Sequence, residues 1–228
     1  MANQKRTQSK NQATIALGTT PQEKFWATEF GTEYIARNLY PTTEKLDAFY
    51  RANYGIARST INKNFLGKLK LASILEVGCS TGNQLIALQK QGFKNLYGIE
   101  INPNAIQLAK KYSENIHIMP GSAFDIPFKD KHFDLVFTSG VLIHINPKDL
   151  PKALKEIHRV SKRYIWGFEY FSLRPQAITY RGHKDRLWKR DFAVEYLKRF
   201  PDLRLAKEQK YPYTTNTNAD AMFLLKKK

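Results

Sequence analysis

The sequence predicts an α/β fold in which seven strands form a mostly parallel sheet with helices on both faces. Two observations carry this prediction. From Ser73 onward, short apolar stretches of strand type alternate with longer segments whose apolar residues recur at helical spacing. There is no internal repeat, so one layered domain explains the alternation better than a repeated unit. Because a helix between two strands returns the chain to the same edge, the strands run parallel.

The expected strands are short apolar stretches bounded by polar or turn-forming residues. They span residues 74–77, 96–99, 116–119, 133–138, 164–168, 203–206 and 222–225.

Helix boundaries are marked by residues that cap or interrupt helices. A helix over 82–91 is expected to end at Gly92, a typical C-terminal glycine. Asn102 followed by Pro103 predicts the start of another, since asparagine caps and proline suits the first helical position. Further helices are expected over 150–160 and over 192–200, the latter ending before Pro201.

The chain divides into three expected regions. Residues 1–20 contain no carboxylate and are rich in Gln, Thr, Lys and Asn, which predicts a disordered basic tail. Residues 21–70 have helix-spaced apolar side chains and predict a helical N-terminal cap. Residues 71–228 form the main α/β domain.

Composition limits the possible partners and location. Apolar residues make up 42% of the 228 residues, and the formal charge is +17. A charge of this sign attracts nucleic acid, a membrane surface or a small anion. No apolar run approaches the ~20 residues of a membrane span. Cys79 is the single cysteine and the five histidines have no paired spacing, so we expect a reduced, cytoplasmic protein without a metal site.

The stretch "SILEVGCSTGNQ" joins the first expected strand to its helix. In parallel sheets, ligands bind beyond the carboxyl ends of the strands. Gly78 and Gly82 let the backbone approach a ligand closely, and the helix that follows directs free N–H groups toward it. Glu100 ends the second strand, where an acid can accept the hydroxyls of a ribose. This arrangement predicts a nucleoside site.

Glu76 changes the expected chemistry of that site. An acid so close to the glycine loop repels a pyrophosphate, whereas it suits an ammonium or a sulfonium. S-adenosylmethionine is a nucleoside joined to an amino acid through a cationic sulfur. The loop is therefore expected to hold the methionine end of this cofactor, with the ribose at Glu100.

Three segments resemble the class I S-adenosylmethionine-dependent methyltransferases: "LEVGCSTGNQ", "GIEINPNAIQLAK" and "GSAFDIPFKDKHFDLVFTSGVLIHI". The resemblance implies a Rossmann-like fold. Ser122 stands where many members carry the aspartate that contacts the adenine amino group, and Ser80 stands where a glycine is frequent. The implied cofactor-binding residues are Glu76, Gly78, Ser80, Thr81, Gly82, Glu100, Ile101, Ser122, Ala123 and Ser139.

A narrower resemblance covers most of the chain from Phe25 to Leu225. "FWATEFGTEYIARN", "GVLIHINPKDLPKAL", "RYIWGFEYF" and "YRGHKDRLWKRDFAVEYLKRFPDLRL" resemble the pseudaminic acid biosynthesis-associated methyltransferases. This resemblance implies a glycan or nucleotide-sugar context.

Two histidines are candidate general bases. His144 follows the fourth strand, and its ordinary pKa near 6.5 suits proton transfer at neutral pH. The alternative is a histidine that packs against the next helix. His183 lies in the arginine-rich stretch that follows the fifth strand.

The arginine-rich stretch is the candidate acceptor site, because guanidinium groups bind carboxylates and phosphates in bidentate geometry. Its candidate residues are Tyr180, Arg181, Arg186 and Arg190. The alternative is a solvated basic surface. Trp26, Glu29 and Tyr34 either close over the site or only pack the cap against the sheet.

The expected function is methyl transfer from S-adenosylmethionine to an oxygen or nitrogen of a small anionic acceptor. RNA or protein methylation is the alternative that the charge allows. The Asn/Asp-Pro-Pro-Tyr combinations typical of exocyclic-amine nucleic-acid methylation are absent. A third possibility is a binding module that retains only the fold.

Overall fold

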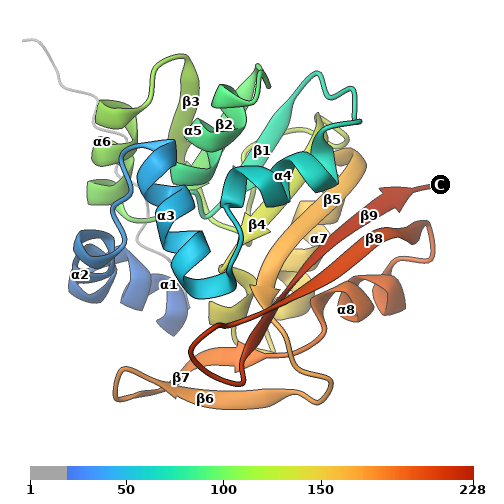
Figure 1. Ribbon diagram of the computed structural model, residues 1–228. Helices are drawn as coiled ribbons and strands as arrows, with labels where there is room; N and C mark the ends of the chain where they lie inside the picture. Colours follow the sequence, from blue (N-terminus) through green and yellow to red (C-terminus); the bar gives the residue numbers. More distant parts are fainter. Residues whose placement is uncertain (1–19) are drawn as a thin grey trace, which may run out of the picture.

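The computed structural model describes residues 20–228 (Figure 1). A seven-stranded sheet has the strand order β3-β2-β1-β4-β5-β9-β8. The strands are β1 (Ile74–Val77), β2 (Leu96–Glu100), β3 (Ile116–Pro120), β4 (Phe133–Ser139), β5 (Ser161–Tyr170), β8 (Leu203–Pro212) and β9 (Ala219–Lys227). The predicted fold class is confirmed.

The first five strands run parallel, and β9 is antiparallel to both of its neighbours. β1 lies between β2 and β4, with Glu76 opposite Gly98 on one side and Phe137 on the other. This register brings the carboxyl ends of the three central strands to the same edge. Any ligand bound there contacts the loops that follow all three strands.

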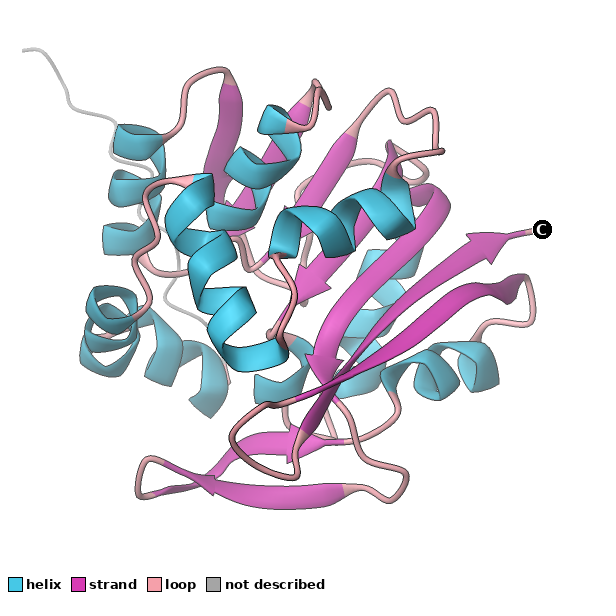
Figure 2. Ribbon diagram, viewed as in Figure 1, coloured by secondary structure: helices cyan, strands magenta, loops and turns pink. Residues whose placement is uncertain are grey.

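Helices cover both faces of the sheet (Figure 2). One face carries α3 (Thr43–Tyr54), α4 (Arg58–Leu66), α5 (Asn83–Lys90) and α6 (Pro103–Tyr112). The other face carries α7 (Leu150–Val160) and α8 (Phe192–Arg199). In α7 the buried apolar residues recur at helical spacing, which fixes the face that packs on the sheet.

The predicted helix caps are present. The side chain of Asn102 accepts hydrogen bonds from the backbone N–H groups of Asn104 and Ala105, and Pro103 begins α6. Gly92 follows α5 with a φ of 92°, a conformation that glycine adopts without a steric cost.

The N-terminal region forms two groups of helices. α1 (Pro21–Ala27) and α2 (Glu29–Arg37) lie near the carboxyl ends of the central strands, whereas α3 and α4 pack on the sheet (Figure 1). The part of the expected cap that borders the ligand edge is therefore α1 and α2. Apart from Thr20, the expected tail lies outside the described residues. No helix within residues 20–228 has the length and apolar character that a bilayer span needs.

A hairpin of β6 (Gln176–Tyr180) and β7 (His183–Lys189) interrupts the alternation, and the sequence analysis did not predict it. Its two-residue turn places Arg181 at φ 47° and Gly182 at φ 82°. Such turns usually carry Asn-Gly or Asp-Gly, so Arg-Gly gives a weak signal. Most residues of the hairpin are exposed. Its sequence therefore lacks the alternation of apolar and polar residues by which half-buried strands are recognised.

Candidate active site

Two adjoining cavities open at the carboxyl ends of β1, β2 and β4. The first has a volume of about 160 Å³ and lies between the central strands and α1 and α2. The second has a volume of about 420 Å³ and lies between α3, β5 and the β6–β7 hairpin. Residues from both the sheet and the cap line the two cavities jointly: Tyr34, Gly78, Ser80, Ser139, Gly140 and His144. A molecule in one cavity can therefore meet a molecule in the other.

The loop after β1 approaches the loop after β4 closely. Gly78 has a φ of +72°, and a Cβ added there would lie 2.8 Å from Cγ2 of Val141. Gly82 adopts the left-handed conformation as the N-cap of α5. Ser80, with a φ of 47°, lines both cavities although it is not a glycine. Thr81 lines neither cavity, and its hydroxyl donates at 3.1 Å to Oδ1 of Asn83, which lines the second cavity.

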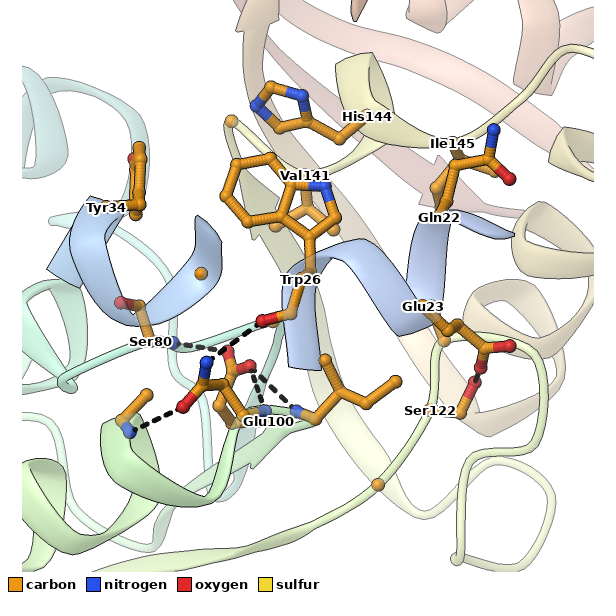
Figure 3. Close-up of a pocket in the computed structure, with 18 of the residues that line it drawn as sticks. Gln22, Glu23, Trp26, Tyr34, Ser80, Glu100, Ser122, Val141, His144 and Ile145 are labelled. Atoms are coloured by element: carbon orange, nitrogen blue, oxygen red, sulfur yellow. Dashed lines mark hydrogen bonds between the residues drawn. The ribbon is translucent and has the colours of Figure 1, made fainter. Parts of the chain in front are cut away.

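Glu100 is held by backbone N–H groups (Figure 3). Its Oε2 accepts from Ser80 at 2.8 Å, and its Oε1 accepts from Ile101 at 2.7 Å and Asn102 at 2.8 Å. Burial raises the pKa of this carboxyl, and the three N–H donors act in the opposite direction. A carboxylate offers about four acceptor positions. Glu100 therefore presents one remaining acceptor to the first cavity.

Glu76 is 2% exposed and lines the second cavity beside Gly78. Its Oε2 has no hydrogen-bond partner in the part of the chain that the structure describes. Burial raises the pKa of Glu76 well above its usual range. A buried carboxylate is costly unless it is paired, so a cationic ligand group would supply the missing partner.

The opposite end of the first cavity is formed by the loop after β3 and by α1. The Ser122 hydroxyl donates to Glu23 Oε1 at 2.5 Å and accepts from the backbone N–H of Phe124 at 3.0 Å. The apolar residues Ile101, Ala123 and Val141 also line the first cavity.

His144 is the better placed of the two candidate bases. It lies in the short helix η1 (Leu142–His144), lines both cavities and contacts Trp26 with ring centroids 4.4 Å apart. Its Nδ1 lies 2.7 Å from the carbonyl oxygen of Arg186, so the Nδ1–H tautomer leaves Nε2 as an acceptor. Burial lowers the pKa of His144 to about 4, so the ring is neutral at pH 7.

The structure does not bring His183 to the site. Its ring is exposed on β7 and packs against Phe25 and Phe30, with centroids 5.0 and 5.2 Å away. It lines neither cavity, and its expected role as a second base stays a prediction.

Tyrosine rings dominate the second cavity. Its tyrosines are Tyr34, Tyr40, Tyr50, Tyr54, Tyr170, Tyr180 and Tyr213. Buried Asp220 also lines the cavity and accepts from the hydroxyl of Tyr54 at 2.6 Å. Burial raises the pKa of Asp220 to about 7.

A buried cation lies beside this cavity. Arg58 is fully buried and donates to the hydroxyl of Tyr50 at 2.7 Å and to Asn62 at 2.8 Å. Its Nη2 has no hydrogen-bond partner, and no carboxylate among residues 20–228 forms an ion pair with it. Its guanidinium group packs over the Phe168 ring at 4.8 Å.

The arginine-rich stretch reaches the site only in part. Tyr180 and Arg181 line the second cavity. Arg186 packs over the Phe25 ring at 4.8 Å, and Arg190 lies 3.4 Å from the carboxylate of Glu195. The structure places these two side chains outside the linings of both cavities.

Comparison with known proteins adds to this geometry. Residues 75–164, from β1 to β5, match the family model described as a methyltransferase domain. This part of the chain is therefore similar to methyltransferase domains. A protein of Haemophilus influenzae is 28% identical over 144 residues, which cover 59% of this chain and 53% of the relative. A demethylmenaquinone methyltransferase of Lactobacillus johnsonii is 35% identical over 111 residues, 44% of this chain and 45% of the relative. The chain thus spans about half the length of these relatives.

Solved structures share the fold of this chain. The PH0226 protein of Pyrococcus horikoshii aligns with a TM-score of 0.62 at 18% identity, over 86% of this chain and 99% of that one. A Burkholderia thailandensis 1,6-didemethyltoxoflavin-N1-methyltransferase, solved with S-adenosylhomocysteine bound, aligns with a TM-score of 0.65 at 15% identity, over 90% and 86% of the two chains. The class I methyltransferase fold is confirmed.

Four further residues, Trp26, Glu29, Tyr34 and Cys79, have defined surroundings. Tyr34 and Trp26 line the first cavity, whereas Glu29 is exposed outside both cavities. Cys79 is buried, and its Sγ lies where a Cβ at Gly98 would be only 2.6 Å away. The thiol fills a crowded position in the loop.

Sequence reasoning missed the residues that come from outside the loops after the strands. These are Gln22, Glu23, Tyr50, Tyr54, Tyr213 and Asp220. Two signals were available. Asp220 is a carboxylate directly before the apolar run 221–225 of the final strand, and Tyr50 and Tyr54 are four residues apart on one helix face.

Glu169 positions the loop that carries His144. It is buried, and its carboxylate accepts from the backbone N–H groups of Val141 at 3.2 Å and Ile143 at 3.4 Å. Burial raises its pKa to about 7. Since the group binds a proton more tightly in the folded protein, its contribution destabilises the fold as pH rises from 4.5 to about 7.

Replacing Glu169 by glutamine is expected to remove this pH dependence, because the amide does not titrate. The free energy of unfolding of Glu169→Gln, relative to the wild type, should shift in favour of the variant by about 3 kcal/mol between pH 4.5 and pH 7.5. Urea denaturation of both proteins at several pH values measures this difference in the free energy of unfolding. The pH-dependent contributions of His144 and Asp220 are the same in both proteins and cancel. A difference that stays constant with pH would contradict the assignment.

Proposed function

We propose that this protein is an S-adenosylmethionine-dependent methyltransferase that methylates an oxygen or nitrogen of a small acceptor. The cofactor is proposed to lie in the first cavity, with its methionine end passing the glycine loop to reach Glu76 at the wall of the second cavity. The rest of the second cavity is proposed to hold the acceptor. The observation that carries the proposal is the unpaired Oε2 of buried Glu76. It lies beside a glycine loop in which the backbone N–H of Ser80 donates to Glu100.

The residues present fit the cofactor. Glu76 offers a buried carboxylate to its ammonium, and Glu100 offers its remaining acceptor to a ribose hydroxyl. Ile101, Ala123 and Val141 provide apolar walls for the base. When bound, S-adenosylmethionine supplies a methyl group already activated by its sulfonium. The cofactor-bound Burkholderia structure of similar fold supports this assignment.

The chain's own contribution is alignment, exclusion of water and proton transfer. Residues shared by the two cavities hold both reactants at the common edge. Nε2 of neutral His144 accepts the proton of a hydroxyl acceptor. An amine acceptor needs only to be bound in its neutral form.

A sialic-acid-like sugar of the pseudaminic type, or its nucleotide conjugate, is the proposed acceptor. The buried Arg58 guanidinium lies beside the second cavity without an ion-pair partner among residues 20–228, while burial raises the pKa of Asp220 to about 7. The charge around the cavity thus favours an anion, and the tyrosine hydroxyls can bond with sugar hydroxyls. A role in glycan biosynthesis and a cytoplasmic location belong to the same proposal.

RNA or protein is the alternative acceptor, favoured by the formal charge of +17. A labelled-methyl transfer assay should compare nucleotide-activated acidic sugars with bulk RNA and a basic protein. We expect label on the sugar. Label on RNA, with activity that falls steeply from about 50 to 200 mM salt, would overturn the proposed acceptor.

Replacing Arg181 by alanine is expected to raise the KM for an anionic acceptor about tenfold, because one charge-assisted hydrogen bond is lost. The affinity for S-adenosylhomocysteine should not change. Arg190→Ala is the matched control, since Arg190 pairs with Glu195 outside the cavities. Equal effects of the two substitutions on KM would remove Arg181 from the acceptor site.

A further inference from the structure

Two polar side chains of α1 reach the end of the first cavity that Ser122 borders (Figure 3). Gln22 and Glu23 are 6% and 9% exposed, and both line the cavity. They come from the N-terminal cap and not from the sheet. These two side chains therefore offer a ligand polar contacts in addition to those proposed for Glu76 and Glu100.

Gln22 has an unsatisfied acceptor at this place. Its Nε2 donates to the carbonyl oxygen of Asp185 at 3.4 Å, while its buried Oε1 has no partner among residues 20–228. Leaving a buried carbonyl oxygen unpaired is unfavourable, because the group has lost its hydrogen bond to water. An N–H donor on a bound molecule would satisfy it.

Glu23 links α1 to the loop after β3. Its Oε2 accepts from the backbone N–H of Thr20 at 2.9 Å, which completes a capping box. Its Oε1 accepts from the Ser122 hydroxyl at 2.5 Å. The capping box accounts for the position of Oε2 of Glu23. The other oxygen places a carboxylate at the wall of the cavity, where it favours donors over acceptors.

The order of residues along the cavity indicates which part of the cofactor would lie beside the oxygens of Gln22 and Glu23. Ser80, Glu100 and Ser122 follow one another across the site (Figure 3). With the methionine end at the glycine loop and the ribose at Glu100, the adenine base takes the end beside Ser122. Its exocyclic amino group carries two N–H donors.

We propose that α1 recognises the adenine amino group through Gln22 Oε1 and the Glu23–Ser122 pair. This inference rests on the proposed function. A 6-oxo base presents an acceptor in place of the amino group and would face the oxygens of Gln22 and Glu23. The cap helix therefore sets the preference of the site for adenine over hypoxanthine.

The experiment compares S-adenosylhomocysteine with S-inosylhomocysteine by isothermal titration calorimetry on the full-length protein. The wild type should bind the adenosine compound at least about tenfold more tightly. In Gln22→Ala and in Glu23→Gln this ratio should fall severalfold. Glutamine at position 23 preserves the capping box, so α1 is retained. Glu29→Gln is the matched control, because Glu29 is exposed on the cap outside both cavities.

The outcomes separate the inference from the function on which it rests. A wild type that binds neither compound overturns both. A wild type that binds S-adenosylhomocysteine, with the same ratio in Gln22→Ala, Glu23→Gln and the control, overturns only the role of α1. A reduced ratio in the two cavity variants alone supports it, and their retained binding shows that they fold.

Discussion

Replacing Glu100 by alanine is expected to weaken the binding of S-adenosylhomocysteine about 100-fold. The substitution removes the proposed ribose acceptor. It also leaves the backbone N–H groups of Ser80, Ile101 and Asn102 without their shared partner, so the loops after β1 and β2 lose their common anchor. Hydrogen bonds to a charged group contribute about 1.5–3 kcal/mol each, and 100-fold corresponds to about 2.7 kcal/mol.

Isothermal titration calorimetry measures this effect. Glu100→Gln should give an intermediate loss, because the amide oxygen keeps part of the acceptor capacity. Glu33→Ala, an exposed acid that lies 3.4 Å from Arg37 on α2, serves as the control. If Glu100→Ala bound as tightly as the wild type, Glu100 would not belong to the cofactor site.

Replacing Gly78 by alanine is expected to reduce cofactor affinity at least about tenfold and to lower stability. Its φ of +72° strains any residue with a Cβ, and the added methyl would meet Cγ2 of Val141 at 2.8 Å. Val141 can relieve this contact only by moving within the lining of the first cavity. The substitution therefore changes the shape of the space proposed for the base.

Gly55 provides the matched control for Gly78. It has nearly the same φ, +71°, at the end of α3, and a Cβ there meets nothing within 4 Å. Gly55→Ala should lower the melting temperature through backbone strain alone and leave cofactor affinity unchanged. Equal losses of affinity in both variants would show that general destabilisation, and not the contact with Val141, explains the result.

The central fold could be predicted because its signals are local. Short apolar strands bounded by glycine, asparagine and proline gave β1 with the observed bounds. The outer part of the sheet was harder to predict from the sequence. β8 runs to Pro212, well beyond the expected 203–206, since pairing with β9 holds residues that are exposed and lack a strand pattern.

The site was predictable where the topology alone determines position. Gly78 and Glu100 follow adjacent parallel strands, so they had to meet at one edge. Gln22, Tyr50 and Asp220 come from a cap helix, a sheet-covering helix and the last strand. Their approach to the cavities depends on how these elements pack, which no local pattern of residues contains.

The central claim is that the first cavity binds S-adenosylmethionine and its product. Its most direct measurement is titration of the wild-type protein with S-adenosylhomocysteine, followed by calorimetry and by the melting temperature. We expect saturable binding of one molecule per chain and a rise in melting temperature with ligand concentration. No heat of binding and no change in melting temperature at about 1 mM ligand would contradict the claim.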